Sequence, residues 1–196
     1  MNTNDIFQLK TQLMDHHVLL IALTLLLVFI MAIVLNRKKI KNSWLRLKTR
    51  SCLKRLGIQQ LSNIQFPDGM GHYFTVDRLI MRHDGISLLL YNRYPGKIFC
   101  ADNIDDWTQM LGRKSYRFRN PLHELDNQVK AISSYIPEVA VNGFLFFEHM
   151  AEFPKGHPDR VIYLDNIPQQ LTQNKQNKVK KPVKVAWEKL VARGKL

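Results

Sequence analysis

The sequence feature that most constrains this chain is an apolar run close to its N-terminus. Residues 18–35, VLLIALTLLLVFIMAIVL, carry no charge, and Thr24 is their one polar side chain. As an α-helix the run would be about 27 Å long, close to the roughly 30 Å thickness of the hydrocarbon core of a bilayer. The sequence therefore predicts a transmembrane helix over 18–35, preceded by a short segment, 1–17.

A signal peptide and a buried core helix are the alternatives for this run. A signal peptide begins with basic residues and ends in small residues at a cleavage site, whereas this run is followed by Asn36 and the basic sequence 37–39. A core helix is rarely apolar on every face. Both comparisons favour the transmembrane helix.

The net charge of +13 is concentrated in two flanking segments. Residues 37–55 contain nine Lys or Arg and no acid, and residues 172–196 contain eight basic residues and one acid, Glu188. The basic block after the apolar run predicts an N-terminus outside the cell and a cytoplasmic C-terminal part. We therefore expect a cell-membrane protein, in the inner membrane of a bacterium, and the low cysteine content fits a reducing compartment.

Residues 36–56 are expected to form a basic juxtamembrane helix. A cationic helix that leaves a membrane is usually held by anionic lipid headgroups, although DNA is an alternative partner. The residues predicted to lie at the membrane surface are Arg37, Lys38, Lys39, Lys41, Trp44 and Arg46.

The pattern over 57–171 predicts a mixed α/β domain. Residues 72–94 are expected to form two strands around a His83-Asp84-Gly85 turn. Asn120 and Pro121 are suited to begin a helix, and an apolar strand, 139–148, follows that helix. Residues 172–196 are expected to be a basic linker ending in a short helix.

These stretches resemble the nuclease-related domain (NERD) family, which is related to the PD-(D/E)xK endonucleases. The matching sequences are VDRLIMRHDGISLLL, YNRYPGKIF, FRNPLHELDNQVKAI and VNGFLFFEHMAEFPKG, between Tyr73 and Gly156. The resemblance implies an α+β mixed sheet with a restriction-endonuclease-like core.

The resemblance also shows where a catalytic site would lie. The family pattern has an Asp on one strand and Glu-x-Lys on the next, which bind Mg²⁺ and orient the attacking water. Asp77 matches the Asp, but Leu90 stands at the Glu position and Asn92 at the Lys position. Glu124 replaces a Gln that the family pattern has in the following helix. We therefore expect no metal, no cofactor and no cleavage, with Asp77 as a vestigial ligand.

The leading hypothesis is thus a membrane-anchored, catalytically inactive NERD domain that acts as a binding or scaffold module. One alternative is a Mg²⁺-dependent nuclease with relocated catalytic residues, and another is a non-cleaving nucleic-acid tether. Possible partners besides lipid are nucleic acid and another membrane protein, and the sequence does not indicate an oligomeric state. The possible nucleic-acid contacts are Arg113, Lys114, Arg117 and Arg119.

The orientation can be tested with a reporter fused after Leu196. Because nine positive charges directly follow the apolar run, the reporter should lie in the cytoplasm. The measurement is the activity of a phosphatase that functions only in the periplasm against that of a fluorescent protein that functions in the cytoplasm. Activity of the phosphatase alone would contradict the predicted orientation.

Overall fold

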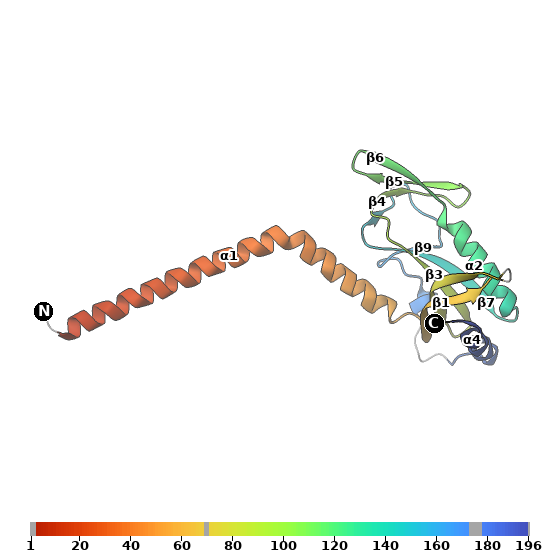
Figure 1. Ribbon diagram of the computed structural model, residues 1–196, viewed down its shortest axis with the longest axis horizontal. Helices are drawn as coiled ribbons and strands as arrows, with labels where there is room; N and C mark the ends of the chain where they lie inside the picture. The colour runs from red at the N-terminus through yellow and green to blue at the C-terminus, as the bar shows by residue number, and fades with distance from the viewer. Residues whose placement is uncertain (1–2, 69–70, 173–177, 196) are drawn as a thin grey trace. The chain divides into compact units, whose positions relative to one another are not determined.

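The computed structural model describes residues 3–68, 71–172 and 178–195, with side chains described from residue 23 onward. The chain divides into two units, Met1–Leu47 and Lys48–Leu196. Helix α1 (Thr3–Leu53) makes up the first unit and begins the second (Figure 1). One continuous helix covers the segments 18–35 and 36–53, for which we expected a transmembrane helix and a juxtamembrane helix.

No helix among the residues whose side chains are described is long and apolar enough to cross a membrane. The apolar run 18–35 begins before residue 23, so its first five residues lie outside that part of the chain. The transmembrane helix over 18–35 stays a prediction.

The second unit is built on a five-stranded mixed sheet in the order β1-β2-β3-β7-β9 (Figure 1). Strands β1 (Gln59–Pro67), β2 (Tyr73–Met81) and β3 (Gly85–Asn92) are antiparallel neighbours. Strands β7 (Ala140–Phe147) and β9 (Val161–Ile162) run parallel to β3. The predicted hairpin and the predicted mixed α/β class are confirmed.

Helix α2 (Pro121–Tyr135) forms the crossover between the antiparallel and the parallel strands. Its start follows the sequence signal, since the Asn120 side chain accepts a hydrogen bond of 2.9 Å from the Leu122 N–H. The helix packs closely on β7 at Gly143, where an added Cβ would lie 2.8 Å from Leu125 Cγ. Only glycine allows this approach, and α2 therefore covers one face of the sheet.

A second sheet of four strands, in the order β6-β5-β4-β8, contains a hairpin that the sequence did not predict. Its strands are β4 (Gly96–Phe99), β5 (Asp106–Leu111), β6 (Lys114–Arg119) and β8 (Ala151–Glu152). Acidic residues precede Trp107, a pattern that favours a loop. The structure instead buries Trp107 completely, with its indole N–H donating to the Ala101 carbonyl at 3.0 Å.

The C-terminal segment contains α3 (Gln169–Thr172) and α4 (Lys181–Arg193). Helix α4 was expected to end a basic tail, but its apolar side chains join the core cluster that α2 covers. Trp187 and Leu190 are buried there, whereas Val191 is 42% exposed. The Lys195 N–H also bonds to the Gln65 carbonyl at 2.9 Å, which ties the chain end to β1.

The packing of α4 can be tested by truncating adjacent side chains. Leu190→Ala should lower the free energy of unfolding by about 2–5 kcal/mol, because Leu190 is wholly buried and its loss leaves a cavity. The matched control, Val191→Ala, removes an exposed side chain of the same helix and should cost about 0.5 kcal/mol or less. Urea unfolding followed by circular dichroism measures both. Equal effects would show that α4 does not dock on the sheet.

Candidate functional site

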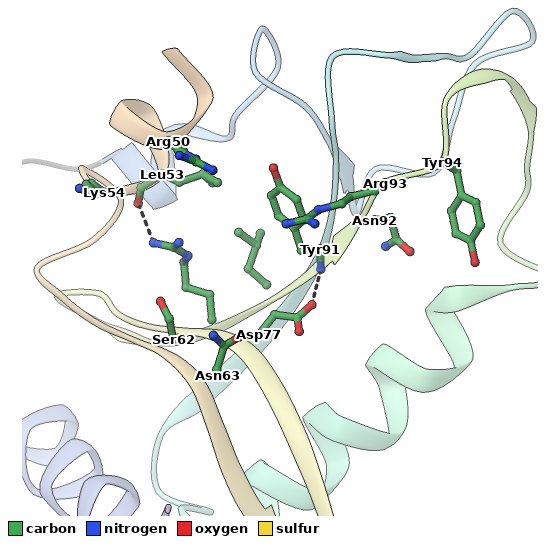
Figure 2. Close-up of a pocket in the computed structure, with 12 residues that line it drawn as sticks. Arg50, Leu53, Lys54, Ser62, Asn63, Asp77, Tyr91, Asn92, Arg93 and Tyr94 are labelled. Carbon is green, nitrogen blue, oxygen red and sulfur yellow. Dashed lines mark hydrogen bonds between the residues drawn. The ribbon is translucent and has the colours of Figure 1, made fainter. Parts of the chain in front are cut away.

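A cavity of about 650 Å³ lies beside the strand ends where the family resemblance places a catalytic site. Figure 2 shows it between the C-terminal end of α1, the middle of β1 and β2, and the C-terminal end of β3. Its lining combines basic residues, strand-end polar groups and two tyrosines: Arg50, Leu53, Lys54, Ser62, Asn63, Asp77, Arg78, Leu89, Tyr91, Asn92, Arg93 and Tyr94. All of them belong to the second unit.

The cavity forms where the sheet opens at Asp77. The β2–β3 ladder ends at the pair Arg78 and Leu89, so Asp77 has no paired residue on β3. On the other side Asn63, opposite Asp77, adopts a left-handed backbone with φ of 54°. Asn tolerates this region better than most residues. Ser62 consequently lines the cavity while Ile64, two residues later, is fully buried in the core.

At this opening the Asp77 carboxylate accepts a hydrogen bond from the backbone. Its Oδ2 accepts a hydrogen bond of 2.7 Å from the Tyr91 N–H, which has lost its partner on β2 (Figure 2). A buried N–H without an acceptor is costly, so the carboxylate stabilises the separation of the two strands. Asp77, predicted as a vestigial metal ligand, thus has a structural contact of its own.

The other residues of the degenerate motif are not brought together. Leu90 is 9% exposed and packs in the core cluster with Trp107, so it does not line the cavity. Asn92 does line it and is 8% exposed. Glu124 is exposed on the first turn of α2, where its Oε1 accepts from Gln128 Nε2 at 3.2 Å. Only Asp77 and Asn92 of the predicted set meet at the cavity.

Mg²⁺ does not fit this set of residues. It is usually bound by carboxylates together with substrate phosphates, and Asp77 supplies the only carboxylate among the lining residues. Among the residues whose side chains are described, no group of three His, Cys, Asp or Glu could hold a metal ion.

Sequence analysis missed the positive charge of the cavity. Arg50 and Lys54 come from the end of α1, Arg78 from β2 and Arg93 from the chain after β3. The Arg78 guanidinium donates to the Gln60 side chain and to the Leu53 carbonyl, and burial lowers its pKa. The one available signal was the basic run at 37–55, which did not distinguish a residue at a cavity from one on a lipid surface.

Tyr91 lies near these cationic side chains and is held in place by two contacts. Its hydroxyl donates to Glu148 Oε1 at 3.0 Å, and its ring stacks on Phe146 with centroids 5.2 Å apart. Burial and the neighbouring Glu148 together raise the pKa of Tyr91 to about 12, whereas Arg93 and Arg50 act to lower it. Both guanidinium groups therefore lie within electrostatic range of the same hydroxyl. Arg93 Nε also lies 3.5 Å from Glu148 Oε1.

The remaining predicted contact residues are exposed. Every residue expected at the membrane surface from Arg37 to Arg46 lies exposed on α1, with Trp44 at 60%. Arg113 lies in the β5–β6 turn, and the other possible nucleic-acid contacts lie exposed on β6: Lys114, Arg117 and Arg119.

Comparisons with known proteins agree with the geometry of the domain. The model of the family described as nuclease-related domain, NERD, matches residues 38–148. An uncharacterized protein of Bacillus anthracis is 27% identical over 78 residues, which are 40% of this chain and 37% of that relative. The chain thus matches little more than a third of the length of this relative. No solved structure matches the chain.

The structural contact of Asp77 can be tested with a pair of variants. Asp77→Ala leaves the Tyr91 N–H without an acceptor and should lower the free energy of unfolding by about 1–3 kcal/mol. Asp77→Asn keeps an acceptor oxygen and should cost about 1 kcal/mol or less. Urea unfolding measures the stability, and amide hydrogen exchange at Tyr91 reports the bond directly. Unchanged exchange at Tyr91 in Asp77→Ala would contradict this assignment.

Proposed function

Because the chain belongs to the nuclease-related domain family, we propose that it is a non-cleaving member of it, a binding module held at a membrane surface. The observation that carries this proposal is the identity and the contacts of the residues at the motif positions. The one carboxylate at the cavity accepts the Tyr91 N–H, and the next positions of the motif are Leu90 and Asn92. The domain keeps the family's scaffold without its hydrolytic groups.

The chemistry of phosphodiester cleavage explains why these changes matter. A metal-dependent nuclease needs carboxylates to hold the ion and a base or lysine to prepare the water. An amide such as Asn92 cannot accept a proton from water near neutral pH. A Glu restored at position 90 would be buried in the core rather than at the cavity, with no partner for its charge.

The membrane part of the proposal is supported by the sequence and by exposed apolar side chains. Large apolar residues of α1 from Leu23 to Leu35 are exposed, in a run that no charge interrupts. A soluble surface rarely carries so long an apolar stretch. The exposed cations that follow, beginning at Arg37, would then meet anionic headgroups.

A second candidate function, a non-cleaving nucleic-acid tether, is favoured by the β5–β6 hairpin. Strand β6 ends the four-stranded sheet, and its cationic side chains and Tyr116 are exposed, the latter by 46%. Cations together with an exposed aromatic ring are typical of surfaces that bind single strands. Basic residues also protect free sheet edges from aggregation, which accounts for the same pattern without a ligand.

The proposal predicts that the purified full-length protein leaves DNA and RNA uncut in Mg²⁺ or Mn²⁺. The reason is that one carboxylate is too few to hold the ion, and the lysine position of the family motif is Asn92. Gel electrophoresis of labelled single- and double-stranded substrates measures this. The control is Asp77→Asn, which identifies a contaminating nuclease because contamination is unaffected by the change. Cleavage by the native protein that disappears in Asp77→Asn would refute the proposal.

A further inference from the structure

We propose that the cavity beside Asp77 binds the dianion of a phosphate monoester, with the Arg50 and Arg93 guanidinium groups as its main contacts. This inference rests on the proposed function, because a hydrolytic site would use the same space for a metal ion. It adds a ligand class to a binding module whose ligand the family match does not name.

The balance of charge at the cavity favours an anion. Four cationic side chains line it against the single carboxylate of Asp77. Asp77 already accepts the Tyr91 N–H, and Arg93 is the one lining cation that pairs with an acid, Glu148. Within the described ranges Arg50 and Lys54 form no ion pair. The unpaired charge at the cavity is therefore positive.

Two guanidinium groups lie near the Tyr91 side chain. In Figure 2 the Arg50 side chain, from the end of α1, and the Arg93 side chain, from beyond β3, both approach the Tyr91 ring. The Arg93 guanidinium carbon lies 5.4 Å from the centre of that ring. Two guanidinium groups that converge in this way can each donate paired hydrogen bonds to phosphate oxygens, a geometry that suits Arg better than Lys.

An independent observation comes from Asn92. Its side-chain Nδ2 is buried and has no hydrogen-bond partner among the described residues, although the residue lines the cavity. An unsatisfied buried donor costs about 1–3 kcal/mol, so such groups usually serve a ligand or a water molecule. The amide at the edge of the cavity thus lacks an acceptor in the protein alone.

Arg78 gives further support because its charge is partly buried without an acid. Its described partners are an amide oxygen and a carbonyl oxygen, and burial lowers the pKa of its guanidinium. A nearby dianion would compensate the desolvation of this charge.

A monoester carries two negative charges near neutral pH, whereas a diester carries one. Arg50 and Lys54, which lack acidic partners, match the charge of the monoester.

The test compares two small ligands with the full-length protein. Isothermal titration at pH 7.5 should show that methyl phosphate binds at least about tenfold more tightly than dimethyl phosphate, since the monoester adds a charge-assisted contact. Equal affinity for the two ligands, or no measurable affinity for methyl phosphate, would overturn the inference.

Binding of methyl phosphate to substituted proteins then tests where the ligand binds. Arg50→Gln should weaken methyl phosphate binding about tenfold, and Arg50→Gln with Arg93→Gln should weaken it further. Arg55→Gln is the matched control, because Arg55 is also exposed and cationic but does not line the cavity. It should bind as the native protein does. Circular dichroism confirms that each variant folds. Equal losses in Arg50→Gln and Arg55→Gln would show a general charge effect and overturn the site.

Larger ligands identify the source of the phosphate. A 5′-phosphorylated oligonucleotide is compared with its 5′-hydroxyl form, and vesicles with phosphatidic acid are compared with vesicles of the diester lipid phosphatidylglycerol. Binding of one carrier that falls in Arg50→Gln supports the inference and names the source. The inference fails if Arg50→Gln leaves the affinities for methyl phosphate, the oligonucleotide and the vesicles all unchanged. Such a failure leaves the absence of cleavage untouched, so the two proposals are judged separately.

Discussion

The hydrogen bond from the Tyr91 N–H to Asp77 stabilises the point at which β3 separates from β2. The β2–β3 ladder ends at Leu89, Asn63 on β1 adopts a left-handed backbone, and the carboxylate of Asp77 replaces the ladder bond that Tyr91 has lost. Without an acceptor there, the open sheet would bury an unpaired N–H. The cavity exists because this one contact makes the opening stable.

The residues near this opening differ from the family's nuclease pattern, with Leu90 and Asn92 at the Glu and Lys positions. Leu90, at the position of the family's Glu, points into the core under α2 and adds apolar packing. The side chains left around the cavity are mainly cationic, and Tyr91 is fixed by Phe146 and Glu148. Cationic side chains in this arrangement favour an anionic ligand.

Local signals in the sequence predicted the parts of the fold that depend on neighbouring residues. Asn120 and Pro121 determine where α2 begins, and the alternation around His83-Asp84-Gly85 gives the β2–β3 hairpin. Contacts between distant segments were not predictable in this way. The docking of α4 depends on an apolar surface that forms only when the sheet is complete, and Arg50 reaches the cavity because Leu53 packs on the sheet. Asp77 was found from the family pattern, but its contact with Tyr91 required the strands to be placed.

The central claim is that the Asp77 carboxylate stabilises the backbone of the opened sheet and does not hold a metal ion. Crystals of the protein soaked in Mn²⁺, with anomalous diffraction measured at the manganese edge, test it most directly. The account predicts no anomalous peak at Asp77 and an intact hydrogen bond from the Tyr91 N–H. A manganese ion within about 2.2 Å of an Asp77 oxygen, with further protein or water oxygens completing an octahedron, would contradict it.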